Sequence, residues 1–188
     1  MHKRFLQRLV TCRQQQLSAS GFKTLADLEK YAEESMSPVL YLLLQSAGSA
    51  DVKVDHAASH LGKALGISNA LRSLARARSP SELSIPQDML VKHSVSQESL
   101  LRGAATAPGL RDAVFDVAAC AKQHLDKARS LSSDVPTHLR VLFLPALPVA
   151  RYLELLRTTD FNPYDPKLQR RSGTLPLSMW WSRLRKQY

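Results

Sequence analysis

The chain has 188 residues, of which 44% are hydrophobic and 22% charged, and its formal net charge is +10. This length and composition exclude a disordered or low-complexity chain and predict one globular domain, while the basic balance favours polyanionic partners such as phosphates and lipid head groups. Cys12 and Cys120 stand apart from any Cys-x-x-Cys or Cys/His cluster in the sequence, so we expect neither a disulfide scaffold nor a zinc site.

Residues 1–23 form a basic segment that ends before the first carboxylate, Asp27. Its arginines, lysines and serines, without any acid, are compatible with a mitochondrial presequence. We favour the other interpretation, in which the segment is a helix of the domain followed by a loop. The residues expected on the buried face of this helix are Phe5, Leu6, Leu9 and Val10.

The next helix is predicted to begin after Thr24, because a threonine followed three residues later by an acid, Asp27, is typical of a capped helix start. Pro38 is expected to kink or restart this helix, since proline lacks the amide hydrogen that a helix interior uses. We expect Gly48 to end it, and a surface turn over residues 49–54 to lead to the helix that follows.

The stretch from Asp55 to Ala77 carries the pattern around which the chain is organised. We expect Asp55 to cap a helix with two rows of residues at three- and four-residue steps. The apolar row consists of Leu61, Ala64, Leu65, Ala70, Leu71 and Leu74, and the small-residue row of Gly62, Gly66, Asn69, Ser73 and Ala77. Each glycine inside a helix costs roughly 1 kcal/mol relative to alanine. Two glycines in one row therefore indicate that something approaches the backbone closely.

The second half of the chain is also predicted to be helical. A long helix is expected after Gly109, and another begins at Pro136, is interrupted by Pro145 and Pro148, and continues over residues 151–157. The apolar face expected for the long helix consists of Leu110, Val114, Val117, Ala118, Ala121, Leu125 and Ala128. No stretch shows the alternation of a strand, so the predicted fold class is all-α.

The small-residue row resembles the second metal-binding helix of the squalene/phytoene synthase family, which reads approximately G-x-A-x-Q-x-x-N-x-x-R-D-x-x-x-D. The matching residues are Gly62, Ala64, Asn69 and Arg72. Gly66 replaces the glutamine, and Ser73 and Ala77 replace the two aspartates. Tyr31 and the segment 83–88, with its proline, resemble two further family elements in the same order.

This resemblance implies a partial isoprenoid-synthase-type helical bundle over residues 24–188, with residues 1–23 as a remnant of the fold. It also implies that the helices bearing the first Asp-rich motif are missing, so the chain resembles a short isoform or an N-terminally truncated product. Family enzymes hold prenyl diphosphates through Mg²⁺, which prefers carboxylate oxygens. No carboxylate occurs between Asp55 and Glu82. We therefore expect no metal, no cofactor and no catalytic residue, but a remnant pocket formed by Tyr31, Gly62, Gly66, Asn69, Arg72 and Ser73.

Three other groups of residues have two interpretations each. Asp112 and Asp116 have the spacing of a metal motif, but we favour a solvated helix edge. His56 and His60 have the spacing of a zinc helix, but with no obvious third ligand we favour surface side chains. The arginines at positions 72, 76 and 78 could bind a diphosphate or a phospholipid head group, or form a solvated basic turn.

The tail over residues 174–188 mixes tryptophans with cations, a combination suited to the surface of an anionic membrane. The residues expected at such a contact are Trp180, Trp181, Arg183, Arg185 and Lys186. Packing of a terminal helix onto the bundle would explain the tryptophans equally well. The longest apolar runs, residues 39–44 and 141–150, are much shorter than the roughly 20 residues of a membrane-crossing helix.

Within the family, the degenerate motif is similar to that of members that help to assemble mitochondrial respiratory chain complex I. This similarity implies a non-catalytic assembly factor, peripheral on the matrix side of the mitochondrial inner membrane. Its implied partners are early complex I subunits or assembly intermediates, with an anionic phospholipid or isoprenoid-like lipid as a further candidate and no nucleic acid. Two alternatives remain open, a prenyl-diphosphate-using transferase and a membrane-lipid-binding adaptor.

Overall fold

The computed structural model describes residues 3–103, 107–170 and 172–188 of the chain, and throughout these ranges the regular structure is helical, which confirms the all-α class. The elements are α1 (Lys3–Ser18), α2 (Leu25–Ser46), α3 (Val52–Leu74), η1 (Pro80–Glu82), α4 (Gln87–Lys92), α5 (Gln97–Leu101), α6 (Leu110–Ser130), η2 (Ser132–Asp134), η3 (Arg140–Phe143), α7 (Ala146–Thr158), α8 (Pro166–Gln169) and α9 (Leu175–Arg185).

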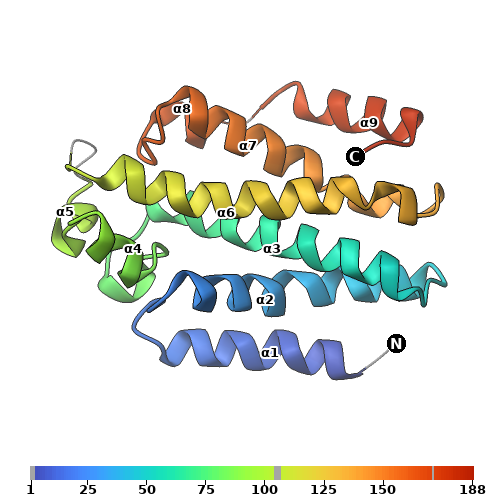
Figure 1. Ribbon diagram of the computed structural model, residues 1–188, viewed down its shortest axis with the longest axis horizontal. Coiled ribbons are helices and arrows are strands. Elements are labelled where there is room, and N and C mark those ends of the chain that lie inside the picture. The colour runs from blue at the N-terminus through green and yellow to red at the C-terminus, as the bar shows by residue number, and fades with distance from the viewer. Residues whose placement is uncertain (1–2, 104–106, 171) are drawn as a thin grey trace.

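The long helices lie side by side, in the order α1, α2, α3, α6 and α7 across the bundle, while α4 and α5 cover one end and α9 lies outside α7 (Figure 1). The central helix α3 packs against both α2 and α6. Because it has neighbours on several sides, its buried residues extend well beyond the predicted apolar row and include Val54, Ala57, Ala58 and Ile67.

The start of α2 is fixed by side chains on both sides of it. The Thr24 hydroxyl accepts from the Asp27 amide and the Asp27 carboxylate accepts from the Thr24 amide, so the predicted capped start is confirmed as a reciprocal capping box. The carboxylate of Asp88 also accepts from the Leu25 amide at 3.1 Å. The segment 83–88 therefore holds the entrance of α2 in place.

Pro38 lies inside α2, which continues past it, so the prediction of a restart at this residue is wrong. Proline removes the amide hydrogen that would bond to the carbonyl four residues earlier, that of Glu34. The Sγ atom of Cys12 on α1 lies 3.6 Å from this carbonyl oxygen. The same thiol lies closer, at 3.3 Å, to the Leu9 carbonyl of its own helix, so its single hydrogen serves two carbonyls.

The central helix begins earlier than predicted. Its N-cap is Asp51, whose carboxylate accepts from the Lys53 amide at 2.8 Å, whereas Asp55 lies in the first turn. The predictions of Asp55 as the cap and of a surface turn up to residue 54 are therefore wrong. Both aspartates can cap a helix, and tertiary contacts favour the longer helix because Val54 is fully buried.

Two other predicted features differ from the structure. In α1 the residues buried at the interface are Phe5 and Cys12, whereas Leu6 and Val10 are exposed, because this helix packs at the edge of the bundle and buries only a narrow face. The helix predicted to begin at Pro136 is present only as the 3-10 helix η3, and α7 begins at Ala146. An interruption therefore occurs at Pro145 but not at Pro148, and α7 accommodates both prolines. They lie at its N-cap and in its first turn, where amide hydrogens have no partner within the helix.

The predicted apolar face of α6 is confirmed, since all seven of its residues are buried. In contrast, α9 buries none of its residues. Within the part of the chain that the structure describes, no helix combines the length and the apolar character needed to cross a membrane.

Candidate functional site

A cavity of about 230 Å³ lies between α1, α2, α3 and the segment 81–84. Four of the six predicted pocket residues line it, namely Tyr31, Gly66, Asn69 and Ser73. The other two, Gly62 and Arg72, do not belong to its lining. The small-residue row of α3 therefore contributes to a cavity, but over only part of its length.

Gly62 and Gly66 mark the close crossing of α3 with α2. A Cβ atom on Gly62 would lie 2.7 Å from the backbone nitrogen of Ser37, and one on Gly66 would lie 2.5 Å from the Cα atom of Ala32. The close approach that the two glycines predicted is therefore that of the backbone of α2. The hydroxyl of Ser37 donates to the Ser59 carbonyl of α3 at 3.2 Å across the same crossing.

Arg72 points away from the cavity. Its guanidinium carbon lies 5.7 Å from the centre of the Tyr152 ring on α7, and burial raises the pKa of that tyrosine. This arrangement is a cation–π contact. Arg76 and Arg78 are exposed, so the three arginines do not converge on the cavity.

The wall of the cavity carries few charges. Arg13 of α1 donates to the Tyr31 hydroxyl and lies 5.4 Å from the centre of its ring. Burial raises the pKa of Tyr31. Among the described residues that line this cavity, Glu82 is the one carboxylate, and it accepts from the Arg78 amide at 2.9 Å. Sequence comparison missed Glu82 because it lies beyond the helix that carries the family motif.

The hydroxyl of Ser73, at the position of the first family aspartate, donates to the Ala70 carbonyl of its own helix at 2.7 Å. A two-metal site that clamps a diphosphate needs several carboxylates facing each other. One glutamate and one helix-bonded serine do not make such a clamp.

The residues predicted to contact a membrane lie together on α9 and just after it. Trp180 and Trp181 are 56% and 51% exposed, and the guanidinium of Arg185 lies 4.8 Å from the Trp181 ring centre. Leu177 and Leu184 on the same helix are also exposed. Packing onto the bundle thus leaves about half of each tryptophan exposed.

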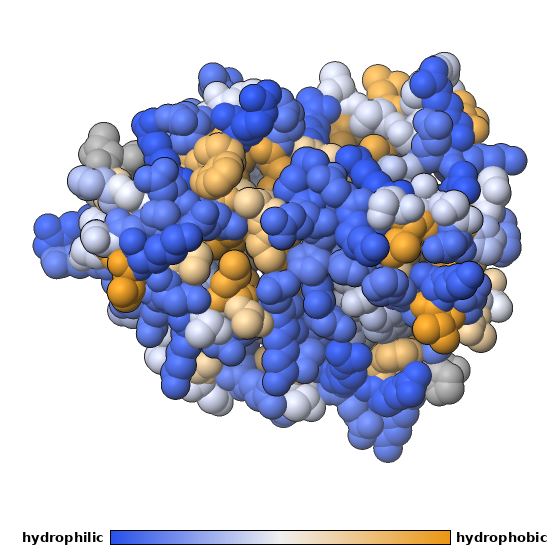
Figure 2. All heavy atoms as spheres, viewed as in Figure 1, coloured by the Kyte–Doolittle hydropathy of each residue, from blue (hydrophilic) through white to orange (hydrophobic). Residues whose placement is uncertain are grey.

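A second hollow, of about 520 Å³, lies between α6 and α7. Figure 2 shows apolar side chains around a depression over these two helices, within a mainly hydrophilic face. Its apolar walls include Phe115, Leu153 and Phe161, and the rings of Phe115 and Phe161 meet edge to face at 5.0 Å. This groove was not predicted, because Phe115 lies outside the apolar row of its helix.

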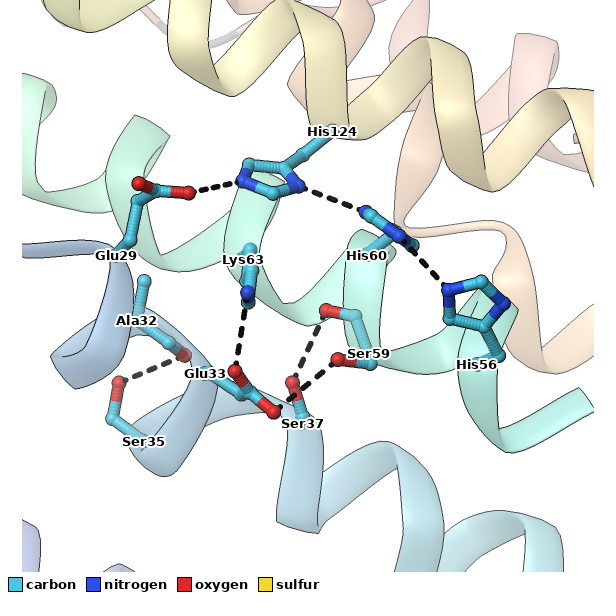
Figure 3. Close-up of polar contacts among 10 residues, drawn as sticks. All are labelled: Glu29, Ala32, Glu33, Ser35, Ser37, His56, Ser59, His60, Lys63 and His124. Carbon is cyan, nitrogen blue, oxygen red and sulfur yellow. Dashed lines mark hydrogen bonds and ion pairs between the residues drawn. The ribbon is translucent and has the colours of Figure 1, made fainter. Parts of the chain in front are cut away.

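His56 and His60 are not isolated surface side chains. Nδ1 of His60 lies 2.8 Å from Nδ1 of His124 on α6, and its Nε2 lies 3.2 Å from Nε2 of His56 (Figure 3). The carboxylate of Glu29 on α2 lies 2.6 Å from Nε2 of His124. The expectation that no third group accompanies the two histidines is therefore wrong, because the packing of α6 against α3 brings in a residue distant in sequence.

Cys120 belongs to the same cluster. Glu29, Cys120 and His124 each offer one ligand atom within 4.8 Å of the others. The expectation that both cysteines stand outside any Cys/His cluster is wrong for Cys120. The cysteine has no Cys or His directly beside it in the sequence, but one turn of α6 places Cys120 and His124 on one face.

Asp116, the second residue of the predicted carboxylate pair, lies elsewhere on α6. It accepts hydrogen bonds from Lys92 and His93, and these bonds lower its pKa.

The helix order and the cavity between α2 and α3 define an isoprenoid-synthase-type bundle. The crystal structure of squalene synthase HpnC from Alicyclobacillus acidocaldarius superposes on 87% of this chain and 62% of its own with a TM-score of 0.77, at 23% identity. Residues 1–181 match the profile described as squalene/phytoene synthase, so the chain belongs to the squalene/phytoene synthase family.

Two relatives in animals resemble the chain over its length. The rat protein named "NADH dehydrogenase (ubiquinone) complex I, assembly factor 6" is 39% identical over 186 residues, which cover 99% of this chain and 56% of the relative. Its homolog in Drosophila melanogaster is 39% identical over 188 residues, with 100% and 56% covered. The chain thus spans a little more than half the length of these relatives.

Proposed function

We propose that this protein is an assembly factor for mitochondrial respiratory chain complex I, and that it binds early subunits or assembly intermediates. The observation that carries the proposal is the 39% identity, over essentially the whole chain, to relatives named as complex I assembly factors. A mitochondrial location is part of this proposal, and the names of these relatives and the net charge of +10 support it.

In this proposal the protein acts by binding and not by prenyl transfer. Cleavage of a diphosphate requires stabilisation of the leaving group, which Mg²⁺ between carboxylates usually supplies. Ser73 and Ala77 replace the two motif aspartates, and Glu82 alone does not restore a clamp. The cavity of about 230 Å³ is also smaller than the roughly 300–1,000 Å³ of typical small-molecule sites. Both features argue against the alternative of a prenyl-diphosphate-using transferase.

The groove between α6 and α7 is a candidate surface for a complex I subunit. It is the larger of the two hollows, at about 520 Å³ against 230 Å³, and aromatic side chains line part of it. Exposed apolar surface of this kind is typical of protein–protein contacts, where aromatic residues contribute most of the binding energy.

Peripheral attachment to the matrix face of the inner membrane is a further part of the proposal, and α9 is the observation that favours it. Its two half-exposed tryptophans, two exposed leucines and basic residues lie on one short helix. Tryptophan favours the head-group region, and basic groups attract anionic lipids. Lipid binding and assembly are compatible in one protein, because complex I is assembled at a membrane.

Complementation tests the assembly role. The chain and a Phe115→Ser variant are expressed in cells that lack the endogenous protein, and assembled complex I is measured on native gels. We expect the unchanged chain to restore complex I and the groove variant to restore it only partly. Val91→Ser, at a residue that is 79% exposed and does not line the groove, is the matched control and should behave like the unchanged chain. A chain that is present in mitochondria at normal levels but restores no complex I would contradict the proposal.

A further inference from the structure

The cluster of Glu29, Cys120, His124 and His60 joins three helices, α2, α6 and α3, at one point of the bundle. Four side chains form a line in which each contacts the next: Glu29, His124, His60 and His56 (Figure 3). Neither the cavity nor the groove described above uses these residues. They therefore form a separate site that needs its own explanation.

With three neutral imidazoles and an ionised carboxylate, the hydrogen bonds allow two arrangements of protons. In the first, Nε2–H of His124 donates to Glu29, Nδ1–H of His60 donates to His124, and Nε2–H of His56 donates to His60. In the second, every donor is reversed, so that Nδ1–H of His124 donates to His60. In the second arrangement the bare Nε2 of His124 lies 2.6 Å from the Glu29 carboxylate, two lone pairs that repel each other unless a cation lies between them.

The nearby thiol of Cys120 favours a metal ion as the cation beside Nε2 of His124 and the Glu29 carboxylate. Cys120 and His124 are four residues apart on α6, the spacing that places two ligands on one helix face. A thiolate, an imidazole and a carboxylate together are ligands that zinc accepts in tetrahedral geometry. Zinc-bound atoms at about 2.0–2.3 Å from the ion lie roughly 3–4 Å apart. The three ligand atoms already lie within 4.8 Å of one another, so side-chain shifts of about 1 Å complete the site.

We propose that Glu29, Cys120 and His124 form a zinc-binding site, and that His60 is a positioning residue that accepts the Nδ1–H of His124. An accepting group behind a zinc-bound histidine fixes its tautomer and orientation. His60 suits this role because its Nδ1 already lies 2.8 Å from Nδ1 of His124. The three protein ligands leave the fourth position to water.

The charges and protons balance in this site. Zinc neutralises the carboxylate and the thiolate, so the bound site carries no net charge. A cysteine thiol carries its proton near neutral pH, because its ordinary pKa is about 8.5. Binding therefore releases one proton, from Cys120, while each histidine keeps one proton and changes tautomer. The ammonium of Lys63 is paired with Glu33 at 3.2 Å (Figure 3).

Competition with a chromogenic chelator tests the site on the purified, tag-free chain after treatment with EDTA. We expect one equivalent of zinc to bind with a dissociation constant in the micromolar range or below. Cys120→Ser and His124→Ala should abolish this binding. His60→Ala should weaken it by about 10- to 100-fold, the usual effect of removing a residue that hydrogen-bonds to a metal ligand. Cobalt in place of zinc should give a thiolate charge-transfer band that Cys120→Ser removes.

Two control variants remove chemically similar side chains elsewhere. Cys12→Ser removes the other cysteine, and His138→Ala removes an exposed histidine, and both should bind zinc like the unchanged chain. Circular dichroism without zinc shows whether each variant folds, and only folded variants are compared. No zinc binding by the unchanged chain, or equal binding by folded Cys120→Ser and His124→Ala, would overturn the proposal. The proposed assembly role does not depend on this outcome.

Discussion

Gly62 of α3 lies directly against Ser37 of α2, with no room between them for a methyl group. A Cβ atom on Gly62 would lie 2.7 Å from the backbone nitrogen and 2.8 Å from the Cα atom of Ser37. Backbone atoms cannot rotate away as a side chain can. The crossing of the two helices therefore requires glycine at this position.

The Gly62→Ala variant should be less stable than the unchanged chain by about 1–3 kcal/mol, the usual cost of overpacking. Replacing a helix glycine by alanine alone would raise the stability by about 1 kcal/mol. A net loss of stability in this variant therefore reports the clash with α2. Gly173→Ala is the matched control, because a Cβ atom there would meet nothing within 4 Å. Urea unfolding followed by circular dichroism measures both. Equal stability of the two variants would show that the helices do not cross this closely.

Thr24→Ala should destabilise the chain by about 1 kcal/mol, because it removes one half of the capping box at the start of α2. Ser96→Ala provides the comparison. Ser96 also occupies an N-cap position, that of α5, but its side chain makes no capping hydrogen bond. Its replacement should leave the urea midpoint nearly unchanged, and an equal loss in both variants would contradict the assigned cap.

The helix pattern was predictable from the sequence to the extent that it depends on local periodicity. The apolar face of α6 and the capped start of α2 follow from residue spacing and turn chemistry, and both were predicted correctly. The restart predicted at Pro38 does not occur, and the Cys12 thiol near the Glu34 carbonyl comes from another helix, which local sequence does not show. The exposure of Leu6 and Val10 likewise depends on α1 lying at the edge of the bundle.

The candidate sites were predictable only where one helix carries them. Gly66, Asn69 and Ser73 share a row on α3, and with Tyr31 they line one cavity. Arg72 shares the motif but faces Tyr152 on α7, because motif membership does not fix the direction of a side chain. The cluster around His124 joins residues 29, 60 and 120 from three helices. The spacing of Cys120 and His124 on α6 was a local signal, but the sequence does not show that Glu29 and His60 lie beside them.

The stability of the zinc-free chain should fall as the pH falls from about 6.5 to about 4. His60 has a pKa of about 4 in the folded chain, lowered by burial from its ordinary 6.5. Between these values the unfolded chain binds a proton that the folded chain does not, which favours unfolding. Above this window both states are neutral and the effect vanishes.

Urea midpoints at about pH 7 and about pH 5, in the presence of EDTA, test this pH dependence. His60→Gln should show a smaller decrease between the two pH values than the unchanged chain, because it lacks the titrating group. An identical decrease in both proteins would mean that His60 has an ordinary pKa.

Trp180→Ala combined with Trp181→Ala should weaken binding to anionic phospholipid vesicles while leaving thermal stability nearly unchanged, because α9 buries none of its residues. Reversal of Arg183 and Arg185 to glutamate should weaken binding further, since each basic group near a membrane contributes about 1 kcal/mol. Sedimentation with vesicles measures both. Equal binding to anionic and zwitterionic vesicles, or no effect of the tryptophans, would argue against a membrane role for α9.

The central claim is that an isoprenoid-synthase-type bundle here serves binding without prenyl transfer, and diphosphate release tests it most directly. The purified chain is incubated with prenyl diphosphates and Mg²⁺, and released diphosphate is measured against a Glu82→Gln variant, which lacks the carboxylate of the cavity wall. We predict no release above the protein-free background for either protein. Mg²⁺-dependent release by the unchanged chain that the Glu82→Gln variant lacks would contradict the claim and make the protein an enzyme.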